Sequence, residues 1–337
     1  MTSMGPESFT NAVRAQGSNL RASGAAVRSQ LQELDLTPWH DRRLGLVGMG
    51  ASYNAALAGL GWYWSAGLEA TAWLGSDLVR PGAMRNISAT VGVSQSGRSP
   101  EVLSSLTESP PDYPTLAITD DRESPIISAA DSTLLLSMLE DSAIRTLGYT
   151  GTLQALGLLA DAVAPEHTPP DWDALADEVD RQVPAAESFA ERTLASVRDI
   201  TSFDVIGSGP QFGTAAQGAL LLREVCRLPG AVYDTYQYLH GPLEAAEPGR
   251  TLIVIGSGRE AKLAVSLAEA GVPVLLVTSE TVTEQAGMTV FKIPAGHDDV
   301  LPLLEILPLQ TLTVLLATAR GMPVGEFRYH QDDTKVE

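Results

Sequence analysis

The residue types best suited to chemistry gather in one hydroxyl-rich loop, Ser94-Gln-Ser-Gly-Arg-Ser99. The loop follows an apolar stretch typical of a buried strand and precedes a stretch that predicts a helix. Free amides and the positive end of the helix dipole attract anions at such a position. Hydroxyls beside a glycine therefore form a cradle suited to phosphate. The alternative is an ordinary helix start, with Ser99 as the cap and Glu101 in the first turn.

A second turn of the same kind, Gly48-Met-Gly-Ala-Ser52, follows the apolar stretch 44–48. Ligands of open α/β sheets bind at the carboxyl ends of strands, so two such turns favour a binding site. The turn is not a dinucleotide fingerprint, because Tyr53 occupies the last position of the GxGxxG pattern. NAD is therefore disfavoured as a ligand.

Composition and charge restrict the classes of partner. The length of 337 residues allows two domains, and 44% hydrophobic with 19% charged residues indicates a globular protein. The net charge of −19 disfavours nucleic acid as a partner. No apolar run of the roughly 20 residues that a membrane helix needs is evident, so we expect no membrane partner. The N-terminus lacks the pattern of a signal peptide, and we expect a cytoplasmic protein.

Cysteine and histidine usage argues against a metal site. The single cysteine, Cys226, excludes an intramolecular disulfide and is interpreted as a small buried core residue. The histidines show no metal-ligand spacing such as HxxxH or HExxH. We expect no metal and no cofactor. The histidines are His40, His167, His240, His297 and His330.

The elements that must position these loops alternate between strands and helices. This alternation implies right-handed crossovers and parallel sheets. In the first half we expect a helix over 7–34, strands at 44–48, 87–93, 115–119 and 133–137, and helices after the two turns. In the second half we expect strands at 203–207, 251–255 and 272–277, with helices over 213–227 and 300–320.

The two halves repeat one order of elements. The first glycine turn lies 46 residues before the next hydroxyl turn in one half (Gly48 to Ser94) and 50 in the other (Gly207 to Ser257). This near-equality indicates an internal duplication. Between the halves, a proline-rich segment at 165–170 interrupts the pattern of elements, and an acidic helix is expected over 171–199. The predicted fold is therefore α/β, with two doubly wound domains in tandem.

Several motifs resemble the sugar isomerase (SIS) domains of the glutamine–fructose-6-phosphate transaminases. In the first half these are Gly48-Met-Gly-Ala-Ser-Tyr-Asn54, Ser94-Gln-Ser-Gly-Arg-Ser99, and Glu140, Thr146, Tyr149 and Thr150. In the second half they are Gly207-Ser-Gly209, Gln217-Gly-Ala-Leu-Leu-Leu-Arg-Glu224, His240-Gly-Pro-Leu243 and Pro308-Leu-Gln310. The opening with Phe9, Ala15, Gln16 and Leu20 is similar to SIS-type glucosamine-6-phosphate deaminases.

The resemblance implies two flavodoxin-like SIS domains with parallel sheets, and it covers nearly the whole chain. We expect an N-terminal helical segment (1–40), a first SIS domain (41–165), a linker helix (166–200), a second SIS domain (201–320) and a C-terminal tail (321–337). It also implies a homodimer that shares its active sites, with a phosphorylated sugar as substrate.

The resemblance assigns roles to individual residues. Glu224 moves a proton between C1 and C2 of the sugar, and His240 from the neighbouring subunit assists ring opening. A carboxylate of adjustable pKa suits the first task, and histidine suits proton transfer at hydroxyls. The phosphate-binding residues implied are Ser52, Ser94, Gln95, Ser96 and Ser99, with Gly50, Ala51 and Ala143 as further substrate-binding positions.

The sequence departs from the family where lysines are expected. A tail lysine of this family often forms a Schiff base with the open sugar, but ungapped matching puts Asp332 there, with Lys335 three residues later. Other family positions hold Leu221, Gln237, Leu239 and Ala51, and there is no N-terminal cysteine nucleophile. Three hypotheses stay open: an amino-sugar-phosphate isomerase or deaminase, a lysine-independent dehydratase of an N-acetylhexosamine 6-phosphate, and a non-catalytic sugar-phosphate sensor.

Overall fold

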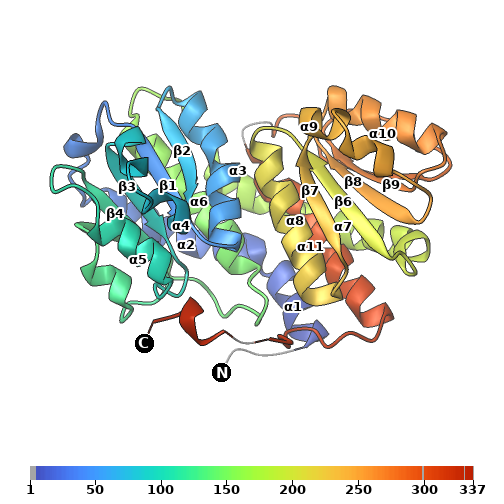
Figure 1. The fold of residues 1–337 in the computed structure, drawn as a ribbon, viewed down its shortest axis with the longest axis horizontal. Coiled ribbons are helices and arrows are strands. Elements are labelled where there is room, and N and C mark those ends of the chain that lie inside the picture. Colours follow the sequence, from blue (N-terminus) through green and yellow to red (C-terminus); the bar gives the residue numbers. More distant parts are fainter. Residues whose placement is uncertain (1–4, 298–299, 330, 337) are drawn as a thin grey trace. The chain divides into compact units, whose positions relative to one another are not determined.

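The computed structural model describes residues 5–297, 300–329 and 331–336. The chain forms two compact units (Figure 1), each built around one sheet. The first-sheet unit takes its described residues from Ser18–Leu139, Leu147–Asp173 and Arg328–Glu337. The second-sheet unit takes them from Met1–Gly17, Glu140–Thr146 and Ala174–Phe327. The domain boundaries given above stay a prediction.

The first-sheet unit holds a parallel five-stranded sheet in the order β2-β1-β3-β4-β5. Its three central strands are buried at every residue, as expected of apolar runs covered on both faces. The structure confirms strands close to each of the four expected in this half. The bounds are β1 Leu44–Gly48, β2 Ala70–Leu74, β3 Ala89–Val93, β4 Thr115–Thr119 and β5 Ser132–Leu135.

The second-sheet unit holds a parallel five-stranded sheet in the order β10-β9-β8-β6-β7. Read from the β7 edge, this order repeats that of the first sheet. The predicted fold class, two doubly wound α/β sheets in tandem, is therefore confirmed. The bounds are β6 Ser202–Gly207, β7 Gly230–Asp234, β8 Arg250–Ile255, β9 Val274–Thr278 and β10 Met288–Lys292.

Helices connect the strands and cover the sheets (Figure 1). The single helix expected over 7–34 is instead two helices, because the chain leaves helical geometry at Ala15. The longer helices are α1 Pro6–Arg14, α2 Gln16–Leu31, α3 Ala51–Ser65, α5 Pro100–Thr107, α6 Leu147–Val163, α7 Trp172–Val197, α8 Pro210–Cys226, α10 Arg259–Glu269 and α11 Leu301–Ala319. The short ones are α4 Gly75–Leu78 and α9 Thr235–Leu239.

Three strands were missing from the sequence-based expectation. Two of them, β2 and β7, are edge strands at the same place in each sheet, and most of their residues are only partly buried. The third, β10, is also an edge strand and ends on an exposed lysine, Lys292. Edge strands lack the continuous apolar run that identified the central strands.

Helix α11 corrects the expectation that no apolar stretch approaches the length of a membrane span. Over 19 residues it is long and apolar enough to cross a membrane by length and composition, alone among the residues that the structure describes. In the second-sheet unit, however, 83% of its most apolar stretch is buried. It packs there against α1 and α8, as a core helix does.

Cys226 ends helix α8 and is a core residue, as the sequence predicted. Its side chain is 1% exposed, and its thiol donates to the Thr313 carbonyl at 3.3 Å. Burial raises the pKa of the Cys226 thiol to about 12. At neutral pH the group therefore stays protonated and weakly nucleophilic.

Candidate functional site

The loop 94–99 joins β3 to α5 and is held in one conformation by its own hydrogen bonds. Ser94 and Ser99 are buried, and the Ser94 hydroxyl donates to that of Ser99 at 3.2 Å. The Gly97 amide donates to the Ser94 carbonyl at 2.8 Å, which closes a tight turn. Gly97 has a φ of 63°, and a Cβ there would overlap Ser124. Only glycine fits this turn without strain.

Ser99 occupies the N-cap position of α5, but its side chain does not cap the helix. Its carbonyl accepts the first intrahelical bond, from the Leu103 amide at 3.0 Å, whereas its hydroxyl makes no hydrogen bond to the helix amides. The alternative, in which the Ser99 hydroxyl caps the helix, is therefore wrong, although Ser99 does occupy the N-cap position. Pro100, the first residue of α5, has no N–H, and the amides of Glu101 and Val102 in the first turn remain available to an anion.

A lysine from the C-terminal tail reaches this loop within the first-sheet unit. The Lys335 ammonium donates to the Ser96 hydroxyl at 2.9 Å and to the Ser99 hydroxyl at 3.4 Å. The Val336 amide donates to the Arg98 carbonyl at 3.0 Å, so backbone and side chain of the tail both contact the loop. Figure 1 shows this tail as the red end of the chain. A positive charge and two hydroxyls thus meet at one point.

The first glycine turn lies at the end of the neighbouring strand. Gly50 caps α3 with a φ of 52°, and Ala51 and Ser52 open that helix. Because β1 pairs with both β2 and β3, the point between β1 and β3 is where the strand order reverses, the usual place for a ligand in this architecture. The Gln95 carbonyl accepts from the Thr119 hydroxyl at 3.2 Å, which fixes that backbone to β4.

The remaining predicted site residues belong to the second-sheet unit. Glu224 lies in α8, and its side chain is partly buried rather than on a solvated helix face. Burial raises the pKa of its carboxyl, and the nearby charge of Arg223 lowers it by less. Within the described ranges, its carboxylate makes no hydrogen bond or ion pair with another residue. A carboxylate of raised pKa with free oxygens is suited to accept a proton.

His240 and Ala143 do not belong to the unit that contains the loop 94–99. His240 ends α9 and is exposed, and its amide donates to the Gln237 carbonyl at 3.2 Å. Ala143 lies in Glu140–Thr146, the short stretch that belongs to the second-sheet unit. Hydrogen bonds bring together Ser94, Ser96, Ser99 and Lys335 of the predicted set.

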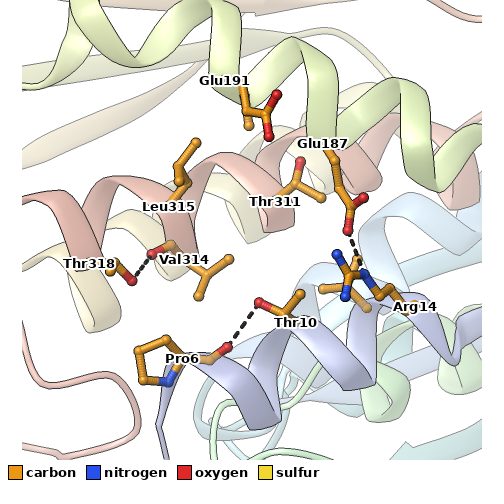
Figure 2. A pocket seen from close by; sticks show the side chains of 11 residues that line it. Pro6, Thr10, Arg14, Glu187, Glu191, Thr311, Val314, Leu315 and Thr318 are labelled. Atoms are coloured by element: carbon orange, nitrogen blue, oxygen red, sulfur yellow. Dashed lines mark hydrogen bonds and ion pairs between the residues drawn. The ribbon is translucent and has the colours of Figure 1, made fainter.

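A cavity of about 210 Å³ lies elsewhere in the second-sheet unit, among α1, α7 and α11 (Figure 2). The Arg14 guanidinium and the Glu187 carboxylate at its side pair with each other at 2.7 Å. The hydroxyls of Thr10 and Thr318 donate to carbonyls of their own helices. The groups most able to bind an anion are already engaged, so this cavity does not suit a sugar phosphate.

Comparison with known proteins matches the second half of the chain to one family. Residues 196–320 match the model of the SIS domain. The resemblance drawn from its motifs is thereby confirmed, and the SIS domain spans α8, with Glu224, and the turn that contains His240.

Longer relatives and solved structures also match this chain. It is 25% identical over 317 residues to the isomerizing glutamine–fructose-6-phosphate aminotransferase of Legionella pneumophila (strain Lens), across 88% of this chain and 51% of the relative. The chain thus spans about half the length of the curated relatives it matches.

Among solved structures, tagatose-6-phosphate ketose/aldose isomerase from Escherichia coli has a TM-score of 0.78 at 18% identity, covering 98% of this chain and 99% of that one. Glucosamine-6-phosphate deaminase from Thermotoga maritima has a TM-score of 0.75 at 20% identity, covering 98% and 100%. At these identities the likeness shows the fold.

One polar residue of note was not found from the sequence. Glu305 lies in the apolar helix α11 and is 2% exposed. Its carboxylate accepts from the Thr214 hydroxyl at 3.3 Å. The signal in the sequence is a lone acid inside the mostly apolar stretch 300–320.

Proposed function

We propose that this chain is an amino-sugar-phosphate isomerase or deaminase that acts on a hexosamine 6-phosphate. The observation that carries the proposal is the contact of the Lys335 ammonium with the Ser96 and Ser99 hydroxyls at the start of α5. Hydroxyls, a positive charge and free helix amides are together the groups that bind phosphate. The names of the relatives, which act on fructose 6-phosphate, support the same class of substrate.

In the proposed reaction Glu224 is the general base. It removes the proton at C2 of the open-chain sugar, and the electrons of the broken C–H bond form the C1=C2 double bond of an enol, while the electron pair of the C1 carbonyl moves to O1, which takes up a proton. Return of that proton to C1 gives a ketose, or a C2 imine when the substituent is an amine. Water then hydrolyses the imine and releases ammonia. One carboxylate that both accepts and returns the proton suffices for this step.

The dehydration hypothesis is kept because of the place of Lys335. While the Lys335 ammonium is hydrogen-bonded to the serines of the phosphate site, it is not free to form an imine with the sugar. Without an imine, the enolate of an N-acetylhexosamine 6-phosphate can expel its C3 hydroxyl as water after Glu224 has removed the C2 proton. This route needs the same base and the same phosphate site, and it differs in the product.

We further propose that the active form is a cytoplasmic homodimer that shares its active sites, with His240 of a second copy assisting ring opening. The exposure of His240 at the end of α9 supports this role, since an exposed histidine is accessible to another subunit. Histidine titrates in the range needed to move protons at sugar hydroxyls.

Product analysis tests the proposed function. Incubation with glucosamine 6-phosphate is expected to give fructose 6-phosphate with one ammonia per turnover, measured by coupled ammonia assay and mass spectrometry. The dehydration hypothesis instead predicts a product of N-acetylglucosamine 6-phosphate that is lighter by one water. Binding of either sugar phosphate without any product would identify a sensor and contradict both enzymatic proposals.

The phosphate site has its own test. Ser96→Ala is expected to weaken binding of the sugar phosphate by about 1.5–3 kcal/mol, the range for a hydrogen bond to a charged group. Lys335→Met should weaken it at least as much, because it removes a charge as well as a donor. Calorimetry measures both, with Ser128→Ala, on an exposed turn outside the loop, as the control. Unchanged affinity in both variants would exclude this loop from the site.

A further inference from the structure

The second-sheet unit contains a cavity at its own topological switch point. Strand β6 pairs with β7 on one side and β8 on the other, so the strand order reverses between β6 and β8. A cavity of about 340 Å³ lies at the carboxyl ends of these strands, lined by Ser208 after β6, Ser257 after β8 and Ser279 after β9. Its size falls within the range of small-molecule sites, about 300–1,000 Å³.

Three serine hydroxyls line this cavity and are held by neighbouring polar groups. The Ser257 hydroxyl lies 3.1 Å from both the Thr278 and the Ser279 hydroxyl oxygens. The Ser208 hydroxyl donates to the Asp234 carboxylate at 2.9 Å. These hydroxyls are fixed by the protein and retain lone pairs, so they suit a ligand that carries several hydroxyl groups of its own.

Two buried carboxyls complete the lining. Glu305 is 2% exposed and Glu260 is 8% exposed. Burial raises the pKa of Glu305 to about 7, although hydrogen bonds from Gln211 and Thr214 oppose this rise. Gly256, with a φ of 132°, leaves room for Glu260, because a Cβ there would lie 2.9 Å from its side chain.

The charge of this cavity is opposite to that of the loop 94–99. The lining contains no lysine, arginine or histidine, and neither Glu260 nor Glu305 forms an ion pair with any residue in the described ranges. A phosphate here would face two carboxyls, and like charges repel strongly at a site of reduced dielectric. An ammonium would instead find two carboxyl acceptors in the lining, while the Lys292 ammonium at the cavity edge donates to the Ser279 carbonyl.

We propose that this cavity is a second binding site, separate from the phosphate loop, for a polyhydroxylated ligand that carries a protonated amine and no phosphate, an amino sugar. The serine hydroxyls at the strand ends pair with the hydroxyl groups of the ligand. The carboxylates of Glu260 and Glu305 receive its ammonium. This proposal does not rest on the isomerase or deaminase chemistry, because it involves other residues of another sheet.

Calorimetry on the full chain at pH 7 tests the site, with glucosamine as the probe. Glucosamine is expected to bind, and N-acetylglucosamine, which lacks the ammonium, is expected to bind at least tenfold more weakly. Glu260→Gln and Glu305→Gln should each lower the affinity for glucosamine at least tenfold. Glu269→Gln, on the exposed face of the same helix as Glu260, is the matched control and should leave affinity unchanged.

The outcomes separate this site from the first one. Glucosamine binding that survives Ser96→Ala but is lost in Glu260→Gln supports the second site, and far-UV circular dichroism confirms that the variants are folded. Three results would overturn the proposal: no binding of glucosamine, equal binding of N-acetylglucosamine, or loss of binding in Ser96→Ala with no change in folded Glu260→Gln.

Discussion

Replacing Glu224 by glutamine is expected to lower turnover of the hexosamine phosphate by about 10²–10⁴-fold, the usual contribution of a general base. The substitution keeps the shape of the side chain and removes its ability to accept a proton, so substrate affinity should persist. Steady-state kinetics together with calorimetry measure the two effects separately. A fall in kcat at nearly constant affinity is the expected signature.

The pH profile gives a second readout of the same residue. Since burial raises the pKa of Glu224, kcat of the unsubstituted chain should decline as pH falls through that raised value, and this limb should be absent from the residual activity of Glu224→Gln. Glu269→Gln controls for the loss of one negative charge on a surface helix. Full turnover by Glu224→Gln would exclude the residue as the base.

Glu305 is expected to make stability fall as pH rises. Its folded-state pKa of about 7 exceeds the ordinary value of 4.5, because burial favours the protonated form. The stabilisation from this group is therefore fully present below about pH 4.5 and is lost as pH rises through 7. The difference of pKa corresponds to about 3 kcal/mol in the free energy of unfolding.

The measurement compares Glu305→Gln with the unsubstituted chain by urea unfolding at pH 5 and pH 8. Relative to the unsubstituted chain, Glu305→Gln should gain about 3 kcal/mol between these two pH values, because it has no charge to bury. Glu269→Gln, with an exposed carboxylate, should show no such gain. A stability difference that stays constant between pH 5 and pH 8 would contradict the raised pKa of Glu305.

The sequence predicted the central strands well because burial leaves a simple pattern. The residues 44–48 contain only leucine, valine and glycine, and 115–119 have an apolar centre between two threonines; both are fully buried strands in the structure. The edge strand β7, Gly-Ala-Val-Tyr-Asp, is partly exposed along its whole length and gives no such run. Strand propensity alone does not identify β7, because its extended conformation depends on pairing with the neighbouring strand β6.

The local part of the candidate site could be predicted from the sequence, whereas the contacts between residues far apart in the sequence could not. The loop 94–99 was identifiable because its hydroxyls, its glycine and its helix are consecutive. The contact of Lys335 with Ser96 joins residues 239 positions apart, and no spacing rule predicts it. Likewise, the bond between Glu305 and Thr214 spans 91 positions. Contacts of this length are set by the packing of whole elements.

The burial of Cys226 makes the chain suitable for site-specific labelling at introduced cysteines. Because the only native thiol is 1% exposed and burial raises its pKa to about 12, maleimide reagents should not react with it at neutral pH. Cysteines introduced at Ser128 in the first-sheet unit and Lys262 in the second-sheet unit, both exposed, would then be the reactive pair. Spin or fluorescent probes could then be attached at these two positions without removal of the native cysteine.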